Sequence, residues 1–296
     1  MEGDYNINNY WWVFNYLLSK QKYETLSYKN ISYPFDTYKD FAGNLNAVEI
    51  SIDTILEKKF NDKLNEFLLK NNINHISFNV IKKNQNSFFN INELNLLNSY
   101  GFKIKNFDKI TLFLEKDIKL QFSKLRKSYK SIINYNKKIC DVKNSFLVNF
   151  DDAQYMINDW LNLYSKKIKK KINVETKNFF QKSIFNKEII LISAYFKGEY
   201  LGGVVFNICN NKATYSLSAN INNINLKSKS AGHLMVWTAI SFLSLNNIDF
   251  IDFGENLKLS SNQYDSKELL KIKNIEKFKL GFGGEICNNY KLSKSI

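Results

Sequence analysis

The alternation of hydrophobic and polar residues changes its period several times along the second half of the chain. Residues 189–196, 200–207 and 212–219 are apolar or alternating over strand lengths, and short Gly- or Asn-containing turns separate them, a pattern typical of hairpins. Residues 234–245 then repeat apolar positions every three or four residues, which is the period of a helix. Residues 248–254 return to alternation and stop at a glycine. This half is therefore predicted to be an antiparallel meander followed by a helix and one more strand.

The first half alternates strand and helix signals and carries no obvious chemistry. The pattern predicts strands over residues 47–52, 75–80 and 109–114, a helix that Asp53 caps and that runs to Phe67, and a second helix over residues 92–100.

A basic amphipathic stretch, residues 122–138, lies between the two halves and is predicted to be one continuous helix. After it the pattern predicts a strand over residues 145–150 and a helix capped by Asp151 or Asp152. The expected architecture is α+β, with an N-terminal half over residues 1–120 and a C-terminal half over residues 121–296. We expect the chemistry in the C-terminal half.

Composition limits the class of protein. With 296 residues, of which 44% are hydrophobic, the chain can bury a sizeable core in two domains or half-domains. Its formal net charge of +14 favours anionic partners, although part of that excess reflects a general bias toward Lys and Asn. The three cysteines are widely separated and form neither a disulfide framework nor a zinc pattern, so no metal site is expected. The N-terminus lacks the basic region of a signal peptide, and a cytoplasmic protein is expected.

The loop that enters the helix at residue 234 is the first candidate site. Its sequence is rich in Lys and Ser, and a helix N-terminus offers free N–H groups and a positive dipole end to an anion. The fork-shaped guanidinium of an Arg is also suited to phosphate, and Arg is scarce here. The candidate anion-binding residues are therefore Lys229, Ser230, Gly232, His233 and Arg126.

Several segments carry a resemblance to a known family. Residues 194–203 look like the strand–turn–Gly segment of GNAT-type acyltransferases, and residues 125–134 look like the basic helix that joins the two halves of FemAB-like proteins. Residues 232–237, 251–254 and 278–285 resemble the C-terminal signature of that family. The last of these, Phe-Lys-Leu-Gly-Phe-Gly-Gly-Glu, is the most specific when it follows Asp-Phe-Gly in this order.

The resemblance implies two tandem GNAT-like halves, each a mixed, mainly antiparallel sheet flanked by helices. It also implies transfer of an acyl or aminoacyl group to an amine, with acyl-CoA or aminoacyl-tRNA as co-substrate and no tightly bound cofactor. The acceptor would be a nucleotide-linked or lipid-linked sugar or peptide, in assembly of a cell-surface glycan or a peptidoglycan precursor. A single glycine, Gly232, stands where acetyl-CoA enzymes have a glycine-rich loop, which keeps the choice of donor open.

The matched positions suggest roles for individual residues. Lys279 is expected to place a cation near the donor, and the alternative is a surface lysine. Asp252 would orient an amine or cap the end of a strand, whereas Glu255 would accept a proton or be exposed to solvent. Four aromatic residues are expected to line the substrate pocket: Tyr215, Trp237, Phe253 and Phe282.

Two non-enzymatic classes remain open. The charge and the 15% aromatic content suit a nucleic-acid-binding module, although no recognition motif is visible. Trp11, Trp12 and Phe14 could instead hold a peripheral protein on the inner face of a membrane, because this apolar patch is too short to span a bilayer. The oligomeric state is left open.

Overall fold

The structure is a computed structural model that describes residues 22–29, 31–38, 41–43, 49–81, 89–209, 211–221, 231–256 and 266–295. The chain forms two compact units. Unit 1 holds the described residues up to Lys109 and those from Ile286 onward, and unit 2 spans Ile110–Glu285. The sequence places the division near residue 120 and assigns the C-terminus to the second half. Trp11, Trp12 and Phe14 lie outside the described residues.

Unit 1 contains a mixed sheet in the order β1-β2-β3-β5-β12, with β4 also beside β5. The pairs β3–β5 and β4–β5 are parallel, and β1–β2, β2–β3 and β5–β12 are antiparallel. Its elements are β1 (Lys22–Tyr28), β2 (Ile31–Tyr38), β3 (Phe41–Gly43), β4 (Glu49–Ser51), α2 (Ile52–Ile55), α3 (Lys58–Lys70), β5 (His75–Ile81), α4 (Ile91–Ser99), the start of β6 (Phe102–Phe113) and nearly all of β12 (Glu285–Ser295).

The predicted helix from Asp53 to Phe67 is in fact two helices, and Asp53 lies inside the first one. The break falls at Glu57, whose backbone is extended. The Glu57 carboxylate accepts hydrogen bonds from the Tyr28 hydroxyl at 2.7 Å and from Lys29 Nζ at 2.8 Å. Both hydrogen bonds lower the pKa of Glu57, and the one from Lys29 has the larger effect. The contacts tie residue 57 to the end of β1, so a new helix begins after it.

Unit 2 contains the sheet β11-β10-β9-β8-β7, and the end of β6 lies next to β11. Strands β10 and β11 are parallel, while the pairs β9–β10, β8–β9 and β7–β8 are antiparallel. Both units are thus mixed, mainly antiparallel sheets with helices, and the predicted α+β class is confirmed. The elements of unit 2 are α5 (Ile118–Ser123), α6 (Lys127–Asn136), β7 (Asp141–Asn144), α7 (Phe150–Ile168), α8 (Val174–Phe185), β8 (Ile189–Phe196), β9 (Glu199–Cys209), β10 (Lys212–Asn220), α9 (Gly232–Leu245), β11 (Phe250–Asn256) and α10 (Ser266–Leu280).

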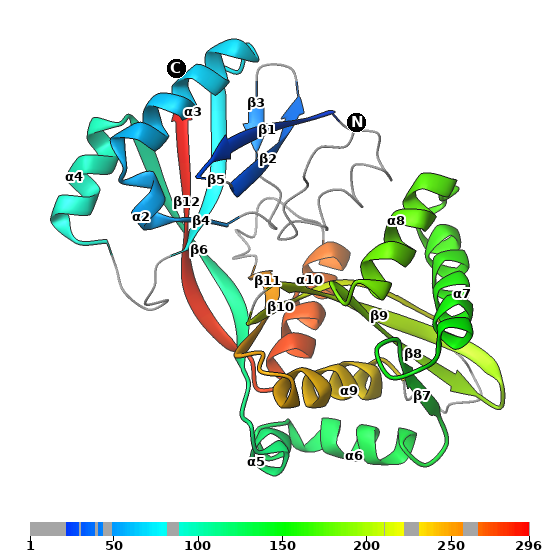
Figure 1. The fold of residues 1–296 in the computed structure, drawn as a ribbon. Helices are drawn as coiled ribbons and strands as arrows, with labels where there is room; N and C mark the ends of the chain where they lie inside the picture. Colours follow the sequence, from blue (N-terminus) through cyan, green and yellow to red (C-terminus); the bar gives the residue numbers. More distant parts are fainter. Residues whose placement is uncertain are drawn as a thin grey trace. The chain divides into compact units, whose positions relative to one another are not determined.

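Helices cover both faces of the unit 2 sheet. Helix α9 packs against β8 and β9 on one face with α6 behind it, and α7 and α8 lie on the other face (Figure 1). Burial on both faces explains why β8 is mostly apolar, with every residue but the last buried. On the face of α7, Trp160 is fully buried between the rings of Tyr164 and Phe180, at centroid distances of 4.8 and 4.9 Å. Its indole N–H donates to the Gly203 carbonyl at 3.3 Å.

Replacing Trp160 tests this packing. We expect Trp160→Ala to lower the free energy of unfolding by about 3–5 kcal/mol, because the change leaves a large cavity between two rings. Tyr155→Ala removes an aromatic ring of the same helix that is 58% exposed, and it should change stability by less than about 0.5 kcal/mol. Urea unfolding of both variants measures the difference, and similar losses for the two would contradict this packing.

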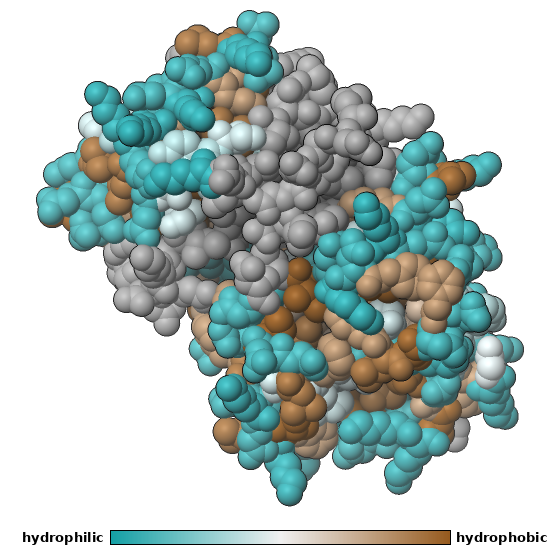
Figure 2. Space-filling view, in the orientation of Figure 1, coloured by the Kyte–Doolittle hydropathy of each residue, from teal (hydrophilic) through white to brown (hydrophobic). Residues whose placement is uncertain are grey.

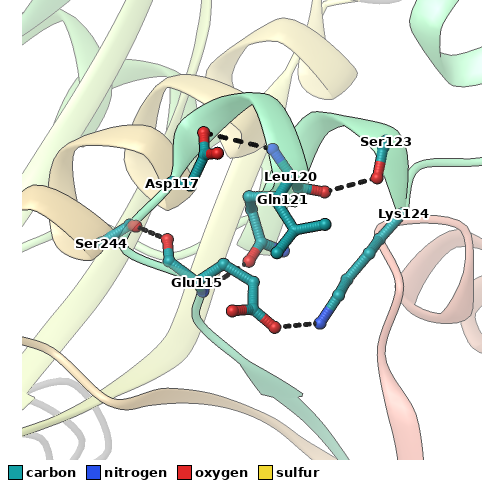
Figure 3. Close-up of polar contacts among 7 residues, drawn as sticks. All are labelled: Glu115, Asp117, Leu120, Gln121, Ser123, Lys124 and Ser244. Atoms are coloured by element: carbon teal, nitrogen blue, oxygen red, sulfur yellow. Dashed lines mark hydrogen bonds and ion pairs between the residues drawn. The ribbon is translucent and has the colours of Figure 1, made fainter.

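The predicted helix over residues 122–138 is interrupted. Helix α5 ends at Ser123 and α6 begins at Lys127, because the backbone N–H of Arg126 donates to the Gly281 carbonyl at 2.9 Å instead of continuing the helix. Polar contacts fix the segment before the break (Figure 3). The Gln121 side chain accepts from the N–H of Glu115 at 2.8 Å, Ser244 donates to the Glu115 carbonyl, and Lys124 pairs with the Glu115 carboxylate at 2.5 Å.

The predicted strand over residues 145–150 is also wrong. The strand of this region, β7, is Asp141–Asn144, and α7 already begins at Phe150. Two asparagines explain the difference. The Asn144 side chain accepts from the N–H of Phe146 at 2.9 Å, and Asn149 caps α7 by accepting from the N–H of Asp152 at 2.8 Å. Such side chain–backbone contacts favour turns and helix starts over strands.

On the face shown in Figure 2, hydrophilic residues predominate among the described residues, and hydrophobic ones form smaller areas. Within the described ranges no helix combines the length and the apolar character that crossing a bilayer requires.

Candidate functional site

The candidate site begins where two parallel strands of unit 2 stop pairing. Residues 212–214 of β10 pair with residues 250–252 of β11, yet β10 continues to Asn220 and β11 to Asn256. The register of β10 against β9 also shifts between Tyr215 and Leu217. A bulge of this kind re-aims side chains and bends the strand. The ladder between β10 and β11 therefore ends at the point where a cavity begins.

The cavity has a volume of about 620 Å³. One wall is the end of β10, a second is the start of α9, and the third is one side of α10. None of the described lining residues is acidic, and three of them are lysines. The lining residues are Tyr215, Ser218, Asn220, Gly232, Lys267, Leu270, Lys271, Asn274, Ile275, Phe278 and Lys279.

Lys279 lies in the last turn of α10. The stretch from residue 277 is therefore the end of a helix followed by a turn. Lys279 Nζ lies close to Gly254, since a Cβ built on that glycine would be 3.8 Å from it. Gly254 has φ +86°, a conformation that side chains rarely adopt. Burial lowers the pKa of Lys279, and the charges of Asp252 and Glu255 offset part of this effect.

The two carboxylates near Lys279 differ in their surroundings. Asp252 is 4% exposed, accepts a hydrogen bond from the N–H of Gly254 at 2.7 Å and pairs with Lys212 at 3.3 Å. Its carboxylate therefore holds the turn that Lys279 approaches. Glu255 is only half-buried. The structure thus places the three predicted catalytic residues near one another.

An aromatic cluster supports the helix end that carries Lys279. Tyr129 of α6 contacts the rings of His233 at 4.3 Å and Phe282 at 5.1 Å, and Phe278 lies 5.1 Å from both. The Tyr129 hydroxyl donates toward the carbonyls of residues 277 and 278 at 3.3 and 3.4 Å. Its ring lies so close to Gly281 that a Cβ there would be 2.3 Å from it. This packing fixes the end of α10 against α6 and α9.

The predicted anion-binding residues do not all meet at the cavity. Gly232 lines it, whereas His233 packs in the aromatic cluster. Arg126 is exposed and its guanidinium lies 5.6 Å from the centre of the Tyr129 ring. Lys229 and Ser230 lie outside the described residues.

Of the aromatic residues expected in the pocket, only Tyr215 lines the cavity. Trp237, Phe253 and Phe282 are at most 3% exposed. Trp237 packs against Phe122 at 5.0 Å, and the other two rings stack on each other at 6.3 Å. These three rings belong to the hydrophobic core around the site, because large apolar side chains are more often buried than exposed.

Sequence reasoning missed the α10 wall, including Lys267, Lys271 and Asn274. The signal was present, since Leu270 and Phe278 are eight residues apart and Ile275 and Phe278 are three apart, spacings that keep one face of a helix. It was hidden by the general abundance of Lys, Asn and Ile.

The lowered pKa of Lys279 predicts a pH effect on stability. Between this folded-state pKa and the ordinary lysine value, the unfolded chain binds the extra proton, so the free energy of unfolding rises with pH in that window. We therefore expect the difference in unfolding free energy, wild type minus Lys279→Met, to increase as pH is raised from neutral toward 10.5, the ordinary value. Urea unfolding at several pH values measures it. A difference that stays flat or falls would contradict the burial of this ammonium.

Comparisons with solved structures reveal similar folds. A FemX structure matches with a TM-score of 0.64 at 10% identity, over 96% of this chain and 90% of that one. L-PGS from Bacillus licheniformis matches with a TM-score of 0.55 at 10% identity, over 97% and 87% of the two chains. The C-terminal domain of a proposed lysylphosphatidylglycerol synthetase from Agrobacterium fabrum matches with a TM-score of 0.60 at 9% identity, over 95% and 86%.

No protein-family model and no curated protein sequence matches the chain. The structural likeness nevertheless extends over nearly all of it, and so includes both units. The chain therefore has the fold of the FemAB-like, GNAT-type acyltransferases.

Proposed function

We propose that the chain is a FemAB-like transferase that moves an acyl or aminoacyl group onto an amine in the unit 2 cavity. The observation that carries the proposal is the position of Lys279. Its half-buried side chain lies at a cavity wall, beside the turn that Asp252 holds and in the field of Glu255. A preorganised cation in a partly dehydrated site is suited to stabilising negative charge that develops during a reaction.

The reaction would proceed by attack of a neutral amine on the donor carbonyl. A C–N bond forms while the carbonyl oxygen becomes an oxyanion, and Lys279 Nζ would donate a hydrogen bond to that oxygen. Collapse of the intermediate breaks the C–S bond of a thioester or the C–O bond of an ester. The proton lost by the amine ends on the leaving group, and Glu255, half-exposed, would be its carrier.

The donor class remains a choice between acyl-CoA and aminoacyl-tRNA. The name lysylphosphatidylglycerol synthetase, carried by one similar structure, states transfer of an amino acid to a lipid and so favours the aminoacyl branch. For the acceptor, the resemblance to peptidoglycan-bridge aminoacyltransferases favours an amine on a nucleotide-linked or lipid-linked sugar or peptide. A cytoplasmic site of action, at or near the inner face of the membrane, is part of this proposal because both donors and such precursors meet there.

A donor panel tests the proposal. The full chain would be incubated with acetyl-CoA or with a mixed pool of aminoacyl-tRNAs, together with amine-bearing cell-wall precursors, and the products followed by mass spectrometry. We expect a mass increase of one acyl or aminoacyl group with one donor class. No modified precursor with either class, for a protein that melts cooperatively, would contradict the proposal.

A further inference from the structure

We propose that Lys167 and Lys271 form a binding site for a phosphate group at the more exposed part of the cavity. In the proposed function this phosphate belongs to the donor, and to that extent the inference rests on that function. The binding experiment below requires no transfer, so the two can fail separately.

Lys167 lies in the last turn of α7, and its ammonium reaches the cavity wall. Lys167 Nζ donates to the carbonyl oxygen of Ser218 at 2.7 Å, and Ser218 is a lining residue on β10. Lys167 is exposed as a residue, and partial desolvation of its side chain, followed by the charge of Lys271, lowers its pKa. The hydrogen bond to a main-chain carbonyl therefore fixes one cation at the edge of the cavity.

Lys271 lies on the opposite wall, on α10. Its charge is the second cause of the lowered pKa of Lys167, so the two ammonium groups are close enough to repel each other. Within the described ranges, no carboxylate forms an ion pair with either lysine, and none of the described lining residues is acidic. An anion bound between two such cations relieves their repulsion.

Neighbouring residues extend this arrangement along α10. Lys267 lies one turn before Lys271, and Asn274 lies nearly one turn after it, both lining the cavity. The three positions of α10 offer a phosphate donors from one wall of the cavity, and Lys167 offers one from the wall of β10. Lysine is a suitable partner because its ammonium binds phosphate as a point charge.

The distance between this pair and Lys279 restricts the ligand. Lys271 and Lys279 are eight residues apart on one helix, which corresponds to about 12 Å along its axis. The wall between them is partly apolar, with Ile275 and Phe278. A suitable ligand therefore has a phosphate separated from the reacting carbonyl by a linker. The pantetheine arm of coenzyme A provides such a linker, and in an aminoacyl-RNA the phosphates of the preceding nucleotides provide a similar separation.

Equilibrium binding of defined probes to the full chain tests the site. The probes are coenzyme A, a short RNA ending in CCA, and pantetheine, which lacks phosphate. We expect Lys167→Met and Lys271→Met each to weaken the binding of at least one phosphate-bearing probe about tenfold, the effect of a charged hydrogen bond. The matched controls are Lys166→Met for Lys167 and Lys273→Met for Lys271. Both control lysines are exposed, lie one and two residues away in the chain, and do not line the cavity. The controls should change affinity by less than about twofold.

The probes also distinguish the source of the phosphate. A loss for coenzyme A alone assigns it to a pantetheine carrier, and a loss for RNA alone assigns it to RNA. The side-chain pKa of Lys167, followed by NMR, should rise when the probe binds. The proposal is overturned if Lys271→Met behaves like Lys273→Met, if pantetheine loses as much affinity as the phosphate-bearing probes, or if the wild type binds neither of them.

Discussion

Lys279→Met is expected to reduce the rate of transfer by roughly a hundred- to a thousand-fold, the loss measured when one oxyanion-stabilising donor is removed from an enzyme. Methionine keeps much of the bulk of the lysine stem and removes its charge. Stability should not fall, because burial already disfavours the charged form of this lysine. Steady-state transfer rates and thermal melts of the purified variant measure the two effects.

Lys277→Met is the matched control for this prediction. Lys277 is an exposed lysine in the same last turn of α10 and does not line the cavity. Its replacement should leave the rate within about a factor of two. Lys279→Arg should restore only part of the lost rate, since a planar fork does not reproduce a point charge. A well-folded Lys279→Met with nearly normal turnover would return Lys279 to the role of a surface lysine.

Gly281→Ala is expected to affect both stability and transfer. The new Cβ would lie 2.3 Å from Cε2 and 2.4 Å from Cζ of the Tyr129 ring, so either α6 or the end of α10 must shift. Overpacking of this kind destabilises by about 1–3 kcal/mol. Because Lys279 lies two residues before the glycine, the shift should also displace its ammonium and lower the rate of transfer. Urea unfolding and the transfer assay measure the two effects.

The double variant Gly281→Ala with Tyr129→Ala isolates the cause. Removing the ring makes room for the new methyl group, so the loss of stability in the double variant should be smaller than the sum of the two single losses. Gly198→Ala is a useful comparison, since nothing lies within 4 Å of a Cβ at that position. In Gly198→Ala the new side chain meets only the backbone strain of a positive φ, so this variant should not affect transfer. Additive losses in the double variant would show that the contact is not the cause.

The strands of unit 2 could be predicted because each is long and strongly patterned. Strands β8, β9 and β10 lie within about two residues of their expected ends, and α9 follows them as expected. Errors occurred where a single hydrogen bond decides the local structure. Asn149 starts a helix where alternation suggested a strand, and the hydrogen bond from Arg126 to Gly281 breaks a helix that its periodicity predicted to be continuous. Such contacts leave no periodic signal in the sequence.

The candidate site was predictable to a similar extent. Lys279 and Asp252 could be found because they stand in motifs with glycines, and the structure places them close to one turn. The aromatic residues were harder to assign, since a ring that lines a pocket and a ring that fills a core look alike in a sequence. Trp237 is the example, because its partner Phe122 lies on another helix. Lys167 was missed for a related reason, because only folding brings the end of α7 to β10.

A structure of the full chain with a stable donor analogue would show whether the cavity beside Lys279 holds the donor during transfer. Two probes cover the donor classes: a ketone analogue of acetyl-CoA, and an adenosine whose amino acid is joined through an amide. We expect one of them to occupy the cavity between β10 and α10, with its carbonyl oxygen within hydrogen-bonding distance of Lys279 Nζ. A bound analogue whose carbonyl lies elsewhere, or a cavity that stays empty at saturating concentrations of both, would contradict this expectation.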